Sequence, residues 1–208
     1  MNISLMLAQF AIIIPSFLIA LSFHEFSHAL TATVLGDNTP KRMGRLTLNP
    51  LAHIDFLGLL FLIVFKIGWA KPVVFNNNNF KHPRLYTILT ALAGPLSNFI
   101  LALACFYVLA YFPVTIFPPA LSLAFRQIFE AIAWVNIMLG VFNALPIPPL
   151  DGSHVLTALL IRRFPSVIMW FYRYSLFILI ALFLLPQTRT ILLAMIVVTE
   201  SLIKTLVF

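Results

Sequence analysis

The feature that most constrains this chain is an early apolar segment that is long enough to cross a lipid bilayer. Residues 5–23 are almost wholly apolar, and the helical pattern continues to Leu35. Gly36 and Pro40 then end that pattern. About 20 apolar residues are enough to span the hydrocarbon core of a membrane. We therefore predict a transmembrane helix over residues 5–35.

The composition of the whole chain also indicates a membrane protein. Hydrophobic residues make up 62% of the 208 residues and charged residues only 9%, compared with about 25% in a typical soluble domain. The formal net charge of +7 comes from 13 basic and 6 acidic residues, with no basic stretch in which aromatic residues alternate. This pattern excludes a nucleic-acid surface. Sparse Lys and Arg residues in a membrane protein instead set its orientation.

Four later segments are predicted to be further membrane-crossing helices: 86–112, 126–145, 167–185 and 189–207. Another apolar segment, 54–69, is short for a crossing and has basic residues on both flanks, which argues against a simple crossing. We predict that it re-enters the membrane or lies at its surface, and that residues 45–50 can form a short strand. The expected fold is an all-α polytopic membrane protein. It has about five to six transmembrane helices and a re-entrant or short β-containing insertion after the first helix.

The positions of the basic residues predict how the protein lies in the membrane. The basic segments are placed on the cytoplasmic side: 37–53, 70–85 and 146–166. The N-terminus then lies outside and the C-terminus inside. We expect residues 1–208 to form a single integral-membrane domain, with a core at about 5–160 and additional C-terminal transmembrane helices at about 167–207.

Three ionisable residues interrupt the first apolar segment, in the sequence HEFSH. His24 and His28 are four residues apart, so they lie on one face of a helix and can hold one Zn²⁺ ion. Glu25 is placed to accept a proton from a water molecule rather than to bind the metal. An ionisable residue inside a membrane is costly and by default indicates function. We therefore favour a metal site over a chance occurrence of the pattern.

A third metal ligand is predicted beyond the next break in the chain. The apolar segment 128–145 runs into FNALPIPPLDG, whose prolines cannot continue a helix. Non-helical backbone at membrane depth is tolerated only inside protein or beside a wet cavity. Asp151 follows this break on the same predicted side as HEFSH, and Gly152 permits close backbone approach. The alternative role for Asp151 is to cap a helix over 152–163, and the two roles are compatible.

These motifs resemble the site-2 protease family of intramembrane zinc metalloproteases. The two hallmarks of that family are an HExxH helix and an LDG motif preceded by an Asn/Pro-rich break, which appear here as HEFSH and NALPIPPLDG. Between them, GRLTLNPLAHID, GWAKPV and LAGPLSN are similar to the compact bacterial branch, which has no PDZ domain. The resemblance covers about residues 20–160.

The resemblance implies roles for individual residues. His24, His28 and Asp151 would bind one Zn²⁺ per chain, and Glu25 would be the general base. Asn143 matches the family asparagine that is proposed to stabilise the oxyanion or to hold the substrate strand, a role suited to an amide donor.

The resemblance also implies an activity and a location. The protein would be a zinc metalloendopeptidase that hydrolyses peptide bonds in or near transmembrane segments of membrane proteins. It would act in regulated intramembrane proteolysis or in the clearance of signal-peptide remnants. The expected partners are a transmembrane-segment substrate and the lipid bilayer, without nucleic acid. The expected location is the bacterial inner membrane, with the active site open toward the cytoplasm.

Three other polar residues are weaker candidates for the site. His53 either approaches the site to bind substrate or has a structural role. His154 lies on the same helical face as Asp151 and either supports a metal ligand or acts as a capping or interface residue. Asn98 is expected to form hydrogen bonds between helices. Substrate contact is the alternative role for Asn98.

An alternative function is that of a membrane transporter or metal-handling protein. Broken helices and intramembrane His and Asp residues also mark ion pathways. Glu25 separates the two functions, because a transporter does not need an acid between two metal ligands. A catalytically inactive scaffold is a second alternative, and the complete set of ligands and base argues against it.

Overall fold

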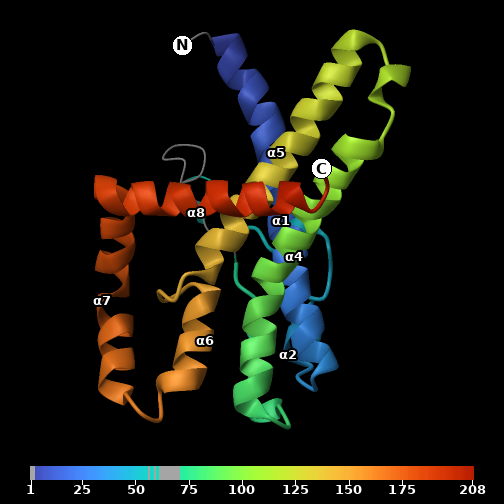
Figure 1. Ribbon diagram of the computed structural model, residues 1–208. Helices are drawn as coiled ribbons and strands as arrows, with labels where there is room; N and C mark the ends of the chain where they lie inside the picture. The colour runs from blue at the N-terminus through green and yellow to red at the C-terminus, as the bar shows by residue number, and fades with distance from the viewer. Residues whose placement is uncertain (1–2, 56, 59, 61–70) are drawn as a thin grey trace.

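The computed structural model describes residues 3–55, 57–58, 60 and 71–208. The helical prediction is confirmed, because helices form most of this part of the chain (Figure 1). The α-helices are α1 (Ile3–Val34), α2 (Thr39–Arg42), α4 (Pro83–Tyr111), α5 (Pro119–Ala144), α6 (Asp151–Leu160), α7 (Pro165–Leu184) and α8 (Pro186–Thr205). Short 3-10 helices lie at η1 (Pro50–Ala52), η2 (Asn77–Asn79) and η3 (Val114–Ile116).

Among the described residues, four helices are long and apolar enough to cross a membrane: Gln9–Val34 within α1, together with α4, α5 and α7. The structure therefore does not support the expected count of five to six crossings, nor a crossing at 189–207. That segment is helical, as α8, but it carries Arg189, Glu200 and Lys204, and it runs across its neighbours in Figure 1 rather than beside them.

The insertion after the first helix differs from the expectation. No β-strand occurs in the part of the chain that the structure describes, so the short strand predicted for residues 45–50 is wrong. Bends and η1 replace it, and the Arg45 side chain donates a hydrogen bond to the carbonyl of Ala52. The re-entrant element predicted at 54–69 lies mostly outside the described residues.

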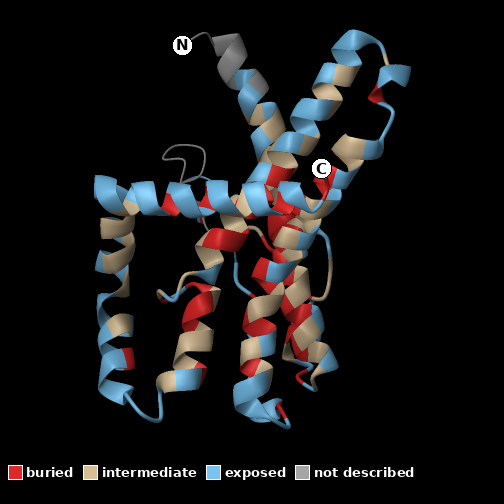
Figure 2. Cartoon of the chain, viewed as in Figure 1, coloured by how far each residue is buried: buried red, intermediate tan, exposed pale blue. Residues whose placement is uncertain are grey.

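Helix α4 is the centre of the bundle and packs against α1, α5 and α6. Figure 2 shows that buried residues gather where these helices meet, whereas α7 is exposed along most of its length. Small residues permit the close approach of α4 and α5, since a Cβ atom at Gly140 would lie 2.6 Å from the ring of Phe99. The hydrophobic core joins α4 and α5 to α8 through Ala102, Cys105, Phe106, Ala133, Ile137, Leu192 and Ile196.

The proline-rich break separates α5 from α6 and brings the second half of the chain back toward α1. Helix α5 ends at Ala144, just before the three prolines. Helix α6 then begins at Asp151, and Gly152 lies so close to the end of α5 that a Cβ atom there would be 2.5 Å from the carbonyl oxygen of Leu145. Gly152 is therefore required for the sharp return of the chain.

A buried carboxylate holds the connection between α1 and α4. Asp37, which is fully buried just after α1, accepts hydrogen bonds from the backbone N–H and the hydroxyl of Thr39, the backbone N–H of Asn76 and the side chain of Asn79. Burial opposes ionisation of Asp37, but these hydrogen bonds outweigh it and hold its pKa below the ordinary value. Asp37 therefore ties the segment before α4 to the end of α1.

We expect Asp37→Ala to lower the free energy of unfolding by about 3 kcal/mol, because four donors lose a charged acceptor. Thermal unfolding in detergent measures the loss, with Lys41→Ala on the exposed surface of α2 as the control. The contribution of Asp37 should be complete above its unfolded pKa of about 3.9 and lost as pH falls through the lower folded pKa. Unfolding of Asp37→Ala at the wild-type temperature would contradict this role.

Candidate metal centre

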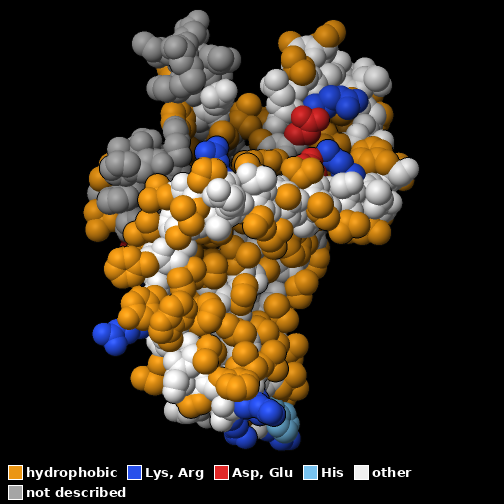
Figure 3. Space-filling model, turned by 60° about the vertical axis from the view of Figure 1, so that its left-hand side comes forward, with side chains coloured by type: hydrophobic (Ala, Val, Ile, Leu, Met, Phe, Trp, Pro, Cys, Tyr) orange, Lys and Arg blue, Asp and Glu red, His pale blue; other side chains and the backbone are white. Residues whose placement is uncertain are grey.

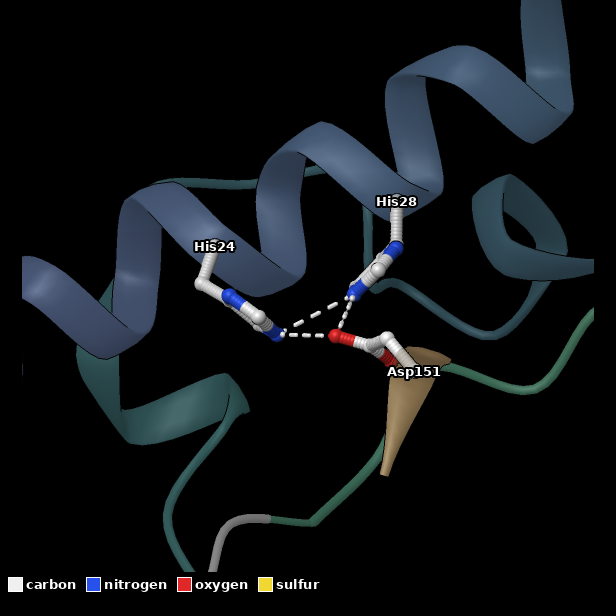
Figure 4. Close-up of side chains that lie close together, drawn as sticks. All are labelled: His24, His28 and Asp151. Carbon is white, nitrogen blue, oxygen red and sulfur yellow. Dashed lines mark hydrogen bonds and ion pairs between the residues drawn. The ribbon is translucent and has the colours of Figure 1, made fainter. Parts of the chain in front are cut away.

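Three side chains from distant parts of the chain converge at the centre of the bundle (Figure 4). His24 and His28 project from the same face of α1, and Asp151 approaches them from the first residue of α6. The Nε2 atoms of the histidines are 3.1 Å apart, and Asp151 Oδ2 lies 3.0 Å from His24 Nε2 and 3.2 Å from His28 Nε2. Both histidines are buried.

Hydrogen bonds at the Nδ1 atoms of His24 and His28 determine which ring nitrogens carry the protons and which face Asp151. His28 Nδ1 lies 2.7 Å from the carbonyl oxygen of Thr90, which can only accept, so Nδ1 carries the proton. His24 Nδ1 lies 2.7 Å from Asn98 Oδ1. The amide nitrogen of Asn98 donates to the Ala20 carbonyl and to Asn136 Oδ1, so Asn98 Oδ1 must accept the proton of His24. Both Nε2 atoms therefore direct a lone pair toward Asp151.

Two nitrogen lone pairs and a carboxylate oxygen repel one another at these distances unless a positive charge lies between them. A proton or a metal cation can supply that charge. In a tetrahedral zinc site, with metal–ligand distances of about 2.0–2.1 Å, ligand atoms lie about 3.3–3.4 Å apart. The observed separations of 3.0–3.2 Å are close to that spacing. Two imidazoles and one carboxylate also form a typical catalytic zinc set that leaves a fourth position open.

Asp151, the first residue of α6, does not occupy the capping position of that helix. The residue at the N-cap of α6 is Leu150, whose side chain makes no capping hydrogen bond. Asp151 lies inside the first turn, where the positive end of the helix dipole favours a carboxylate. The predicted capping role of Asp151 is therefore wrong, and its carboxylate faces the histidines.

A glycine provides the space that the histidine rings occupy. Gly94 of α4 lies against the site, and a Cβ atom at this position would be 2.6 Å from His24 Cε1 and nearer still to His28 Nε2. Contacts below 3.0 Å cannot be kept without movement of the rings, and both rings are fixed by their Nδ1 hydrogen bonds. The position therefore requires glycine.

Glu25 lies beside the three converging residues and outside their cluster. It follows His24 in α1, so its side chain points about 100° further around the helix. Its carboxylate is buried and accepts a hydrogen bond of 2.9 Å from the backbone N–H of Val73. The irregular segment 71–76 thus runs past Glu25, and its Phe75 ring reaches His154 of α6 at a centroid distance of 5.9 Å.

The remaining predicted residues lie outside the cluster of His24, His28 and Asp151. Asn143 lies in the last turn of α5, not in the break, and its amide nitrogen donates to the carbonyl of Leu139. His53 is fully buried, and its Nε2 donates to the Thr47 carbonyl of the same loop at 2.8 Å. His154 is partly buried in α6 against Phe75.

Sequence reasoning missed several groups that support the site. Asn136 is fully buried in α5. Its side-chain oxygen accepts a hydrogen bond from Asn98, and its amide nitrogen donates one to the carbonyl of Ile132. A polar residue in the apolar segment 126–145 is a signal that could have identified it. The backbone groups of Thr90 and Val73 carry no such signal, because any residue type provides them.

Comparisons with known proteins agree with these features. A sequence model described as Peptidase family M50 matches residues 113–182. YwhC of Bacillus subtilis, named as a candidate zinc metalloprotease, is 39% identical over 148 residues, which cover 69% of this chain and 67% of the relative. Rip2 of Mycobacterium tuberculosis, named in the same way, is 32% identical over 182 residues, covering 85% and 68%. Rip2 of Mycolicibacterium smegmatis is 35% identical over 156 residues, covering 69% and 55%. No solved structure gives a significant match.

Proposed function

Because the chain belongs to peptidase family M50, the site-2 proteases, and is a membrane metalloprotease, we propose that it is a zinc endopeptidase that cleaves membrane proteins in or near their transmembrane segments. The observation that carries this proposal is the convergence of His24, His28 and Asp151 with both Nε2 lone pairs directed inward. Two imidazole nitrogens and a carboxylate oxygen at this spacing match the ligand set of a catalytic zinc site, and a zinc ion would supply the positive charge that they need.

In the proposed mechanism, His24, His28 and Asp151 would hold one Zn²⁺ ion. Bound zinc would supply Lewis acidity, which polarises a carbonyl group and lowers the pKa of a water molecule toward about 7. Glu25 accepts the proton of the attacking water and delivers it to the leaving amine. The Val73 N–H keeps the Glu25 carboxylate in place for both steps.

Two asparagines have separate proposed roles. Asn98 holds His24 in one tautomer through its Oδ1 atom, and thereby keeps the Nε2 lone pair available. Asn143 would stabilise the oxyanion or hold the substrate strand, as the family resemblance implies. In this structure its amide donates to Leu139, so it would have to exchange that hydrogen bond for one to substrate.

The proposed substrate is a transmembrane segment of another protein. A helical substrate keeps its carbonyl groups in internal hydrogen bonds, so it would have to unwind locally before attack. Segment 71–76 runs beside Glu25 without regular secondary structure, and an unwound substrate strand could pair with its backbone. Both regulated proteolysis and clearance of signal-peptide remnants are compatible with such a site. We place it in the bacterial inner membrane, open toward the cytoplasm.

The direct test combines metal content with cleavage of a single-span substrate in proteoliposomes. We expect about one zinc per wild-type chain and cleavage at an internal peptide bond, identified by mass spectrometry of the products. His24→Ala and Asp151→Ala should each lose both the metal and the cleavage. Glu200→Ala on α8 is the control, because it removes an acid outside the cluster. Cleavage by Asp151→Ala at the wild-type rate would refute the assignment, and release of only terminal residues would refute endopeptidase action.

A further inference from the structure

Helix α8 is held at a fixed place by two connections. Its buried residues pack on α4 and α5, as part of the hydrophobic core. At its start, only Leu185 separates α8 from the end of α7, and α8 runs across the bundle from that point (Figure 1). Because α7 and the α4–α5 pair both cross the membrane by length and composition, they determine the depth at which α8 lies.

The basic end of the molecule provides the reference for that depth. We use this term for α2, the start of α4 and the turn between α6 and α7, which lie together at the bottom of Figure 1. The basic residues of this end are Lys41, Arg42, Lys81, Arg84, Arg162 and Arg163. Arg84 joins two of these parts, because its side chain donates to the carbonyl groups of Ala158 and Leu159.

Two helices measure the distance from the basic end to α8. Helix α7 has 20 residues, so it is about 30 Å long at 1.5 Å per residue. On α4, the ring of Phe106 lies against Lys204 of α8, and Phe106 is about 33 Å along the axis from Arg84. The hydrocarbon core of a bilayer is about 30 Å thick. Both measures place α8 at the membrane surface opposite the basic end.

The residues of α8 form three stripes around its axis. The buried stripe faces α4 and α5 and contains Leu192, Ile196, Ile203 and Val207. On one flank is an exposed apolar stripe of Ile191, Met195, Val198, Leu202 and Leu206. On the other flank is a polar stripe with Gln187, Thr190, Glu200, Ser201, Lys204 and Thr205, which is interrupted by the exposed apolar residues Leu193 and Val197. An exposed apolar stripe opposite a polar one is the pattern of a helix that lies in a membrane surface.

The charges and aromatic residues around α8 agree with this depth. Glu200 and Lys204 form an ion pair of 2.6 Å that would be costly inside the hydrocarbon core. The hydroxyl groups of Tyr107 and Tyr111 donate to the carbonyl groups of Leu206 and Val207, as expected of tyrosines at a membrane surface. In Figure 3 most charged side chains lie toward the two ends of the molecule. One Lys or Arg side chain projects from the side between the ends, and the rest of that surface is mainly hydrophobic.

We propose that α8 is a lipid-binding helix that lies in the headgroup layer of the leaflet opposite the basic end. Its apolar stripe inserts between the acyl chains, and its polar stripe, with Lys204, faces the phosphate groups and water. Its partner is therefore the phospholipid surface itself. This arrangement revises the expectation that the C-terminus lies on the inner side, which depended on a crossing at 189–207. The inference is independent of hydrolytic activity.

Single cysteines at the two ends of α8 test the proposal. Gln187→Cys and Thr205→Cys, each in the full chain with Cys105→Ala, are exposed to a membrane-impermeant maleimide in intact and in permeabilised cells. Arg163→Cys marks the basic end. Labelling at both ends of α8 should be equal in the two preparations, whereas labelling of Arg163→Cys should be lost in intact cells. If the protein inserts the other way round, all three patterns reverse together.

A crossing helix would give a different result. One end of α8 would then be labelled from the side of Arg163→Cys and the other end from the opposite side, which would overturn the proposal. Spin labels at Val198→Cys and Ser201→Cys test the contact with lipid. We expect Val198→Cys to collide mainly with oxygen dissolved in lipid and Ser201→Cys mainly with a water-soluble nickel chelate. Equal exposure of both labels to the chelate would show that α8 does not bind the lipid surface.

Discussion

Glu25→Gln is expected to lower the rate of peptide hydrolysis by about 10³-fold to 10⁴-fold while the protein still binds one zinc per chain. Glutamine has nearly the same size and can accept the hydrogen bond from the Val73 N–H with its side-chain oxygen. It cannot accept the proton of the attacking water. The fold and the metal ligands should therefore persist, and only the proton transfer should be lost.

Single-turnover cleavage and elemental analysis of the same sample measure both properties. Glu130→Gln is the control, since it makes the same change at an exposed acid of α5 that lies outside the cluster of His24, His28 and Asp151. The result also separates the protease from a transporter. Loss of function with retained zinc supports hydrolysis, whereas wild-type function in Glu25→Gln would support transport and would remove Glu25 from the proposed mechanism.

Gly94→Ala is expected to weaken zinc binding by about 10-fold to 100-fold, although the residue binds no metal itself. The added methyl group would lie 2.6 Å from His24 Cε1 and nearer still to His28 Nε2. The two rings cannot both move aside and keep the hydrogen bonds from their Nδ1 atoms to Asn98 and to the Thr90 carbonyl. Zinc affinity can be measured by competition with a chelator of known affinity.

Gly140→Ala is the matched control for Gly94→Ala. Gly140→Ala adds the same methyl group at another close contact between helices, that of α5 with α4. There the methyl group meets the ring of Phe99 and not the two histidines. Both substitutions should lower the temperature of unfolding, and only Gly94→Ala should lower zinc affinity. Equal zinc affinity in the two variants would show that Gly94 does not shape the site.

The parts of the site that sequence reasoning identified are those with a strong local signal. His24 and His28 share a helical spacing, and Asp151 follows a proline-rich break, so their chemistry could be assigned without knowledge of the fold. The prediction that Asn98 forms hydrogen bonds between helices is confirmed, but the sequence did not identify His24 as its partner. The Thr90 carbonyl that orients His28 could not be identified at all, because it is a backbone group of another helix. The positions of both groups depend on how α4 packs against α1.

The errors in the fold have a similar physical origin. Segment 189–207 is apolar on average, yet its few charged residues and its contacts with α4 and α5 place α8 across the bundle. The average hydropathy of a segment does not show whether its helix runs parallel to its neighbours or across them. The alternation in residues 45–50 was too short to specify a strand, and the Thr47 carbonyl accepts the hydrogen bond of His53 instead of pairing with a second strand.

The distance along the chain between the ligands has a consequence for stability. His28 and Asp151 are separated by 123 residues, and they belong to helices that no disulfide connects, because Cys105 is the sole cysteine of the chain. An ion held by both closes most of the polypeptide into one large ring. Closing a long ring removes much of the conformational freedom of the unfolded chain. The metal would thus cross-link the two halves of the protein. Loss of the metal would then lower both the free energy of unfolding and the catalytic activity.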